Sequence, residues 1–220
     1  MKKVAVVLSG CGFLDGAEIR ESVLTLLALN IEGIEFDIFA PDIEQFHVVN
    51  HIEGAPIEGV SRNVLQEAAR IARGDISALD NLVVDEYDGL VIPGGFGVAK
   101  NLSNFAFDGA DGEVISSVGR TIESFNSHNK PIAAVCIAPS IVAMILGEKK
   151  PSLTIGNDIG TASELEKTGA IHKECATRDC VVDINHLLVS TPAYMDGSAQ
   201  LKDVFSGITK TVQAFVHLAK

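Results

Sequence analysis

Cys136 is the residue of this chain whose surroundings point most directly to chemistry. The apolar run at 131–135 is typical of a buried parallel strand, and Pro139 to Leu146 is typical of a helix that follows it. A thiol on such a turn projects from the carboxyl edge of a sheet toward the free N–H groups of a helix, which stabilise a thiolate. We therefore predict a nucleophile at Cys136, although most free cysteines are small core residues.

A second turn, at Gly94 and Gly95, is expected to meet Cys136 at the same edge of the sheet. The segment 88–93 is typical of another buried strand, and the glycine pair after it lets backbone amides face a cleft without obstruction by Cβ atoms. An amide of Gly94 or Gly95, together with that of Ile137, is the predicted oxyanion hole. Many glycine pairs are only tight connections, but that reading does not explain the pairing with Cys136.

A thiol that adds to an aldehyde needs a proton partner, and Glu18 and Glu21 are the candidates. The two glutamates are three residues apart at the start of a predicted helix, so both can face the cleft at the end of the first strand. The glutamate that is not catalytic is expected to be a solvated acid favoured by the helix dipole. The pattern leaves both open as the proton shuttle.

These residues require a framework of alternating strands and helices, which is typical of a parallel sheet covered on both faces. The predicted strands are Val4–Leu8, Phe36–Phe39, Leu90–Ile92 and Ile132–Val135. The predicted helices are Glu18–Leu29, Gly112–Ser127, Pro139–Leu146 and Lys202–His217. Their expected buried apolar residues are Ile19, Val23, Leu26 and Leu27 in the first, Val114, Val118 and Phe125 in the second, and Val204, Ile208, Val212 and Phe215 in the last.

The chain of 220 residues is expected to form one domain, 1–220, with an insertion at about 41–88. A helix over Ser61–Arg73, with Ser61 as a possible cap, is predicted inside this insertion. A second irregular stretch at 152–192 is expected to hold a helix over Thr161–Thr168, ended by Gly169. Val181–Asp183 and Leu188–Ser190 are typical of a hairpin.

The composition excludes several function classes. With 47% hydrophobic and 5% aromatic residues, the chain suits an aliphatic core around a sheet, and a formal charge of −12 argues against nucleic acid or an anionic membrane as a partner. No segment approaches the roughly 20 apolar residues that span a bilayer. The run after Met1-Lys-Lys is too short for a signal sequence, so we expect a cytoplasmic protein with four reduced cysteines.

Several motifs resemble the ThiJ/PfpI superfamily, which is class I glutamine amidotransferase-like: 92–95 (IPGG), 100–103 (KNLS) and 135–139 (VCIAP). Three further segments, 9–12, 15–19 and 190–195, narrow the resemblance to the ElbB-type branch, described as glyoxalase-like and linked by name to isoprenoid biosynthesis. The resemblance implies a flavodoxin-like three-layer α/β sandwich with a nucleophile elbow, and it implies that the protein forms a homodimer. The activity that it implies is that of a glutathione-independent glyoxalase of the lyase type, with a low rate. The implied reaction converts glyoxal, a small dicarbonyl, and water to glycolate without metal or other cofactor.

The resemblance also assigns roles to single residues. Spacing back from Gly33 matches Glu21 to the family glutamate and gives it a slight preference, whereas anchoring on Asp15 favours Glu18. His172 is implied as a pocket-lining residue. Some family members carry a histidine directly after the cysteine for peptide or amide hydrolysis; here that position is Ile137, which weakens those activities.

The same residues are also compatible with other functions. A redox or stress sensor built on an oxidisable Cys136, and a protein deglycase, are the alternative functions. Gly10, Gly12 and Gly16 do not satisfy the dinucleotide fingerprint, so no cofactor is expected. His172, Cys175 and Cys180 match no strong zinc spacing, so no metal is expected either. Cys11 follows the first predicted strand and could approach Cys136 as a redox partner.

Overall fold

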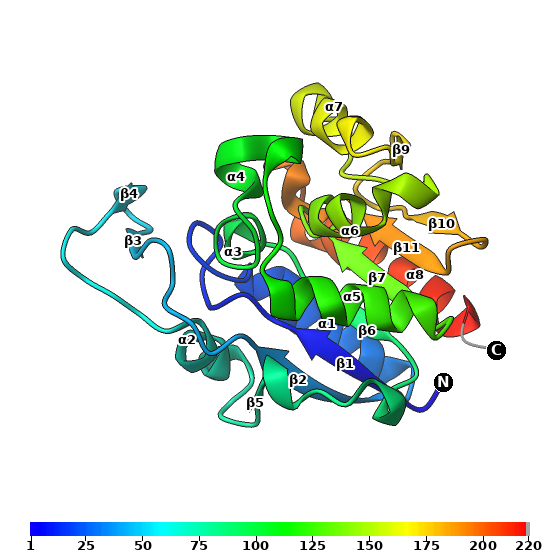
Figure 1. Ribbon diagram of the computed structural model, residues 1–220, viewed down its shortest axis with the longest axis horizontal. Coiled ribbons are helices and arrows are strands. Elements are labelled where there is room, and N and C mark those ends of the chain that lie inside the picture. The colour runs from blue at the N-terminus through cyan, green and yellow to red at the C-terminus, as the bar shows by residue number, and fades with distance from the viewer. Residues whose placement is uncertain (219–220) are drawn as a thin grey trace.

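A seven-stranded sheet forms the middle layer of the computed structural model, which describes residues 1–218 (Figure 1). Its strands are β1 (Lys3–Val7), β2 (Glu35–Ala40), β5 (Ser77–Ala78), β6 (Leu90–Ile92), β7 (Ile132–Val135), β10 (Val181–Asp183) and β11 (Leu188–Thr191). Their order is β10-β11-β7-β6-β1-β2-β5, and every neighbouring pair is parallel except β10 with β11. Two short pairs lie outside this sheet: β3 (Val49–Asn50) with β4 (Ala55–Pro56), and β8 (Ser152–Leu153) with β9 (Ile171–His172).

Helices cover both faces of this sheet, which confirms the predicted α/β sandwich (Figure 1). The helices are α1 (Ile19–Ile31), α2 (Val64–Ile71), α3 (Phe96–Lys100), α4 (Phe105–Asp108), α5 (Ser116–Ser127), α6 (Pro139–Leu146), α7 (Ile159–Lys167) and α8 (Leu201–Leu218). Helices α3, α5 and α6 lie on one face and α1 and α8 on the other.

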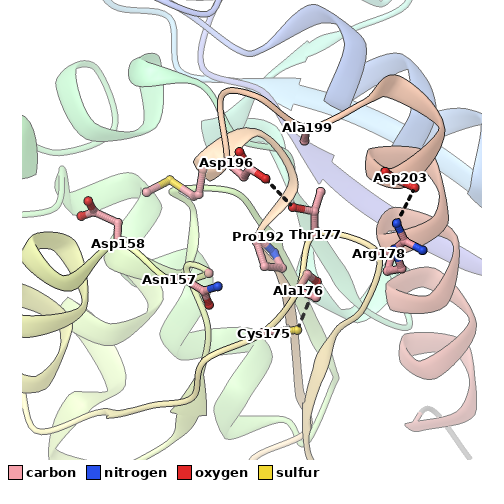
Figure 2. A pocket seen from close by; sticks show the side chains of 12 residues that line it. Asn157, Asp158, Cys175, Ala176, Thr177, Arg178, Pro192, Asp196, Ala199 and Asp203 are labelled. Carbon is pink, nitrogen blue, oxygen red and sulfur yellow. Dashed lines mark hydrogen bonds and ion pairs between the residues drawn. The ribbon is translucent and has the colours of Figure 1, made fainter.

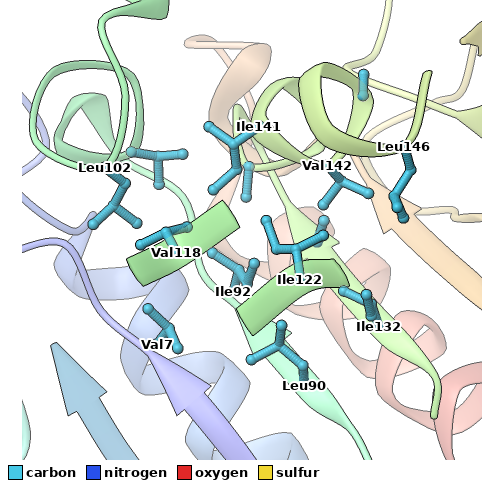
Figure 3. Packing of buried hydrophobic residues seen from close by; sticks show 14 of the residues in the cluster. Val7, Leu90, Ile92, Leu102, Val118, Ile122, Ile132, Ile141, Val142 and Leu146 are labelled. Carbon is cyan, nitrogen blue, oxygen red and sulfur yellow. The ribbon is translucent and has the colours of Figure 1, made fainter. Parts of the chain in front are cut away.

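The core is therefore divided in two by the sheet. Alternate residues of β1 serve the two halves, because successive side chains of a strand point to opposite faces: Val4 and Val6 pack on the side of α1 and α8, whereas Ala5 and Val7 pack on the side of α5 and α6. Figure 3 shows the second half, where Ile122 of α5 lies over the strands. Both sets are almost fully buried, so the sheet holds the strand ends at the site in fixed positions.

The strands and helices that carry the candidate site match those predicted from the sequence. The predicted strands at β6 and β7 and the predicted helix at α6 are confirmed to the residue. The last helix, the hairpin of β10 and β11, and the end of α7 before Gly169 are also confirmed. The four apolar residues predicted to bury α8 are each 1% exposed or less.

The predicted apolar face of α1 is wrong for three of its four residues, whereas Leu26 is partly buried against the core. Ile19, Val23 and Leu27 are 44% to 49% exposed, and the buried residues of the helix are Glu21, Ser22, Thr25, Ala28 and Leu29. The helix is rotated so that its small residues pack toward the sheet and α8 and so that Glu21 faces the end of β7. Small side chains allow this close approach.

Two other helices begin later than predicted. Helix α5 begins at Ser116 rather than Gly112, because Val114 pairs with Ser103 in an isolated β-bridge. Helix α2 begins at Val64, and its cap is Asn63 rather than Ser61: the Asn63 side chain accepts a hydrogen bond from the amide of Gln66.

The segment 41–88 leaves the sheet after β2 and returns to it at β5. Between them the pair β3–β4 extends away from the body of the molecule, and α2 lies beside β2 (Figure 1). Within residues 1–218, no helix has the length and apolar content needed to cross a membrane.

Candidate active site

Cys136 lies on the turn between β7 and α6, with its backbone in the left-handed region at φ 61°. This conformation costs a non-glycine residue about 1 kcal/mol or more, and such strain collects at functional sites. The amide of Cys136 donates to the carbonyl oxygen of Thr191 at the end of β11, 2.9 Å away, which holds the turn against the sheet. The side chain is 8% exposed, so the sulfur reaches a small opening from a buried position.

Two backbone amides face the sulfur. The amides of Gly95 and Ile137 lower the pKa of the Cys136 thiol, but burial and the nearby charge of Glu21 raise it more, so the resting thiol has a pKa well above its ordinary value. Gly95 and Ile137 therefore present their amides to the sulfur, on the side where an oxyanion hole is expected. The amide of Gly94 faces the carboxylate of Glu21 instead, so of the two glycines only Gly95 serves the sulfur.

Glu21 is the buried carboxyl beside Cys136. It lies in the first turn of α1 with no exposed surface, and its Oε1 accepts a hydrogen bond from the amide of Tyr194 at 3.0 Å. Its Oε2 has no partner of hydrogen-bond geometry among the described residues. Burial, with the charge of Glu18 acting in the same direction, raises the pKa of Glu21 to about 8. At neutral pH this carboxyl therefore holds a proton next to the thiol.

Glu18 has a different place. It is the N-cap of α1, and its side chain accepts a hydrogen bond from the amide of Glu21 at 2.5 Å. Its carboxyl is half-buried, and burial raises its pKa. Both glutamates thus lie near the same cleft, but the structure puts Glu21 beside the sulfur and Glu18 at the helix cap.

A cavity of about 240 Å³ opens onto Cys136. Its lining residues are Phe13, Glu18, Gly95, Phe96, Cys136, Ile137, Thr161, Tyr194 and Met195. Most of this wall is apolar, and Glu18 is the one carboxyl among these lining residues. The sequence reasoning missed the aromatic residues of the wall, although Phe96 directly follows the glycine pair and Tyr194 belongs to the segment 190–195 that carried the resemblance.

Two residues considered from the sequence lie outside this cavity. His172, expected to line the pocket, is in β9, where its Nε2 accepts from the amide of Ile155 at 3.4 Å. His172 pairs with Leu153 of β8, and it is not among the residues that line this cavity. Cys11 is half-buried, does not line the cavity, and has a pKa raised mainly by burial.

A larger cavity, of about 500 Å³, shares Met195 with the first in its lining and holds no comparable pair of thiol and buried carboxyl; Figure 2 shows its lining. Arg178 is bound to Asp203 at 3.3 Å, and the Thr177 hydroxyl donates to Asp196 at 3.5 Å. The thiol that lines this larger cavity is that of Cys175, and burial and the charge of Asp179 raise its pKa to about 11. Volume alone would favour this cavity as the active site, but the thiol with a buried carboxyl beside it is at Cys136.

Gly94 is expected to tolerate no side chain. A Cβ atom there would contact the Cβ of Cys136, lie 2.5 Å from Oε2 of Glu21 and lie 2.9 Å from the carbonyl oxygen of Val135. We expect Gly94→Ala to destabilise the fold by about 2 kcal/mol, because a close-packed site must shift to admit a methyl group. Urea unfolding measures the loss. Gly197→Ala, where a Cβ meets nothing within 4 Å, is the control, and equal stabilities of the two variants would contradict the packing described.

The raised pKa of Glu21 is expected to make the fold less stable as the pH rises. Between about pH 4.5 and 8 the folded state holds a proton on Glu21 that the unfolded state has lost, so the free energy of unfolding falls across this range. Glu21→Gln removes this effect. At pH 9 the free energy of unfolding of this variant should exceed that of the wild type by on the order of 3 kcal/mol. Chemical denaturation at several pH values tests this, with the exposed Glu148→Gln as a control. Parallel pH profiles for wild type and Glu21→Gln would exclude a buried protonated carboxyl.

Comparisons with known proteins place this chain in a family. The model of the DJ-1/PfpI family matches residues 13–196. A human protein named glutamine amidotransferase-like class 1 domain-containing protein 3, mitochondrial, is 43% identical over 98% of this chain and 83% of its own length. The rat ES1 protein homolog, mitochondrial, is 41% identical over 98% of this chain and 84% of its own length.

A solved structure matches over the whole chain. It is the crystal structure of an isoprenoid biosynthesis protein with an amidotransferase-like domain from Ehrlichia chaffeensis. The two chains are 39% identical and cover each other fully, with a TM-score of 0.94.

Proposed function

Since the chain belongs to the DJ-1/PfpI family, we propose that it is a cofactor-independent glyoxalase that converts glyoxal and water to glycolate. One observation carries the proposal: a buried carboxyl with a pKa of about 8, Glu21, lies beside the buried thiol of Cys136. This pair provides a nucleophile and a proton carrier with the properties that an internal oxidation and reduction of a dicarbonyl requires.

The first step is addition of sulfur to one carbonyl of glyoxal. The S–C bond forms as the C=O π bond opens, and the oxyanion that develops accepts hydrogen bonds from the amides of Gly95 and Ile137. A proton completes the hemithioacetal. The Glu21 carboxyl, protonated at rest, gives this proton to the oxyanion and becomes a carboxylate, while the thiol proton leaves to solvent water.

The second step moves hydrogen between the two carbons. The Glu21 carboxylate removes the proton from the carbon bound to sulfur while the aldehyde oxygen gains a proton from water, which gives an enediol. The hydroxyl on the first carbon then loses its proton to water as Glu21 returns the abstracted proton to the other carbon. The first carbon is thereby oxidised to a thioester and the second is reduced to a hydroxymethyl group. Water then cleaves the thioester, which releases glycolate and restores the Cys136 thiol, so no external oxidant or reductant enters.

The deglycase alternative is tested in the same assay. A glyoxalase consumes free glyoxal, so its action on a glycated amine cannot exceed the rate at which that amine releases glyoxal by itself. We expect glycolate formation from a preformed glycated amine to reach this limit and then to be independent of added protein. A rate that continues to rise in proportion to the protein would instead support direct deglycation and overturn the glyoxalase proposal.

Neither the sensor nor the amidotransferase reading has comparable support. Redox-sensing cysteines are exposed and have a low pKa, whereas the Cys136 thiol is buried with a raised pKa. An amide-hydrolysing centre needs a histidine beside the sulfur, and the cavity that opens onto Cys136 is lined by none. A link to isoprenoid metabolism rests on the printed name of the Ehrlichia protein alone.

The compartment also stays a proposal. We expected a cytoplasmic protein, but the human and rat relatives are both called mitochondrial. The chemistry proposed needs only that Cys136 is reduced, and all four cysteines are free in the structure.

A further inference from the structure

Tyr194 is held by two consecutive residues of α1, and the proposed reaction uses only one of them. The Glu21 carboxyl accepts a hydrogen bond from the backbone amide of Tyr194 at 3.0 Å. Nη1 of Arg20 donates to the Tyr194 hydroxyl at 3.2 Å, and the guanidinium carbon lies 5.9 Å from the centroid of the tyrosine ring. Helix α1 therefore contacts Tyr194 both at its backbone and at the far end of its side chain.

The backbone around Tyr194 has a conformation that such contacts must maintain. Ala193 is fully buried with φ 45°, in the left-handed region that residues with a Cβ atom rarely adopt. Tyr194 itself interrupts the helical turn 193–195 with φ −81° and ψ 16°. Backbone in sparsely populated regions persists only where its surroundings hold it in place. The contacts with Glu21 and Arg20 hold Tyr194 from the side of α1.

The Tyr194 amide also decides how the Glu21 carboxyl is oriented. The last torsion of a glutamate side chain is broad, so a contact to one carboxyl oxygen is needed to fix the other. The amide binds Oε1. Oε2 is the oxygen on the side of the thiol, because a Cβ atom placed on Gly94 would meet both Oε2 and the Cβ of Cys136. Anchoring Oε1 therefore directs Oε2 toward Cys136.

We propose that Arg20 and Tyr194 form a clasp that positions the Glu21 carboxyl for proton transfer at Cys136. Neither residue exchanges a proton with the substrate: Arg20 holds the Tyr194 side chain, and the Tyr194 amide holds Oε1 of Glu21. Tyr194 also lines the cavity at Cys136, so the clasp fixes one wall beside the sulfur. Its effect on rate rests on the proposed function, whereas the position of the carboxyl is a property of the resting protein.

The ionisation of Glu21 reports on the clasp. Burial raises the pKa of Glu21 to about 8, and the charge of Glu18 acts in the same direction. Hydrogen bonds with Tyr194, Cys136 and Gly94 lower this pKa, and the bond from the Tyr194 amide lowers it most. A hydrogen bond to a carboxylate favours its charged form, so loosening the Tyr194 amide should raise the pKa of Glu21.

A titration of Glu21 by NMR without substrate tests the clasp. The protein carries ¹³C at its glutamate carboxyl carbons, and the Glu21 signal is the one that Glu21→Gln removes. Tyr194→Phe keeps the ring and every charge, whereas Arg20→Met removes the guanidinium. Each is expected to raise the midpoint of the Glu21 titration by about 0.5 to 1 pH unit. Arg120→Met, at an exposed position of α5 on the other face of the sheet, is the matched control and should leave the midpoint unchanged (Figure 1).

The rate of glycolate formation provides a second readout. We expect kcat to fall about tenfold in Tyr194→Phe and in Arg20→Met, because a carboxyl that is poorly oriented transfers protons less often. KM should change far less than kcat, since neither variant alters the thiol or the amides that face it. Arg120→Met should keep both constants of the wild type.

Circular dichroism shows whether each variant is folded, which the small size of the changes favours. A midpoint that Tyr194→Phe or Arg20→Met leaves unchanged or lowers would overturn the clasp, as would an equal shift in Arg120→Met. Unchanged kcat in both variants would overturn its role in the reaction. A wild type that forms no glycolate would overturn the proposed function, but the titration would still decide whether Arg20 and Tyr194 position Glu21.

Discussion

Replacing Cys136 with alanine is expected to lower the rate of glycolate formation from glyoxal by at least about 1,000-fold. The thiol makes the only covalent bond to the substrate in the proposed reaction, and no other group at the cavity can replace it: the remaining lining residues have no thiol and no amine. The rate is measured as glycolate over time, with metal chelated and glutathione omitted. The variant should remain folded, since the change removes one small atom at the mouth of a cavity.

The other cysteines provide the controls for this experiment. Cys175→Ala and Cys11→Ala remove thiols that do not line the cavity at Cys136 and should keep rates close to the wild type. If Cys136→Ala retained wild-type turnover, or if Cys175→Ala lost it, the nucleophile would lie in the larger cavity and the mechanism would be wrong.

Glu21→Gln is expected to lower kcat about 100- to 10,000-fold, which is the range for loss of a general acid or base. The amide keeps the size of the carboxyl and can still accept a hydrogen bond from Tyr194, but it cannot carry a proton between the two carbons of the substrate. KM should change far less than kcat, because the cavity wall is unaltered. Initial rates over a range of glyoxal concentrations separate the two constants.

Glu18→Gln is the contrasting variant, because Glu18 faces the same cavity at the helix cap. Its kcat is expected to fall about tenfold or less. A larger loss of kcat in Glu18→Gln than in Glu21→Gln would move the proton shuttle to Glu18. In that case the raised pKa of Glu21 would reflect burial without a catalytic role.

Much of the site's framework could be predicted because its signals are local in sequence. Short apolar runs bounded by glycine or proline specify β6 and β7, and Pro139 marks the start of α6 directly after Cys136. Parallel strands align their carboxyl ends, so Gly95 and Cys136 had to meet at one edge. The position of the thiol followed from these patterns.

The rotation of α1 could not be predicted because it depends on tertiary packing. Its apolar residues lie on a face that the body of the protein leaves open, whereas the buried face contains Glu21 and small residues. A hydrophobic pattern alone gives the opposite orientation. A spacing of three residues places Glu18 and Glu21 on one side of the helix but does not say which of them is buried. The rotation of α1 buries Glu21.

Contacts between segments that are distant along the chain could not be predicted from the sequence either. Tyr194 holds Glu21 through its backbone amide, 173 residues away, and its side chain lines the cavity. His172 was expected to line the pocket, but its pairing in β9 depends on an irregular stretch with few local signals. Such positions are fixed by tertiary contacts, which only the assembled fold reveals.

The proposed reaction is tested most directly by following ¹³C-labelled glyoxal with the wild-type protein by NMR, in the presence of a chelator and without glutathione. We expect labelled glycolate as the product, at a rate proportional to the protein concentration. Glyoxal that disappears no faster than in buffer, or that yields no glycolate, would contradict the proposed function of the Cys136 and Glu21 pair.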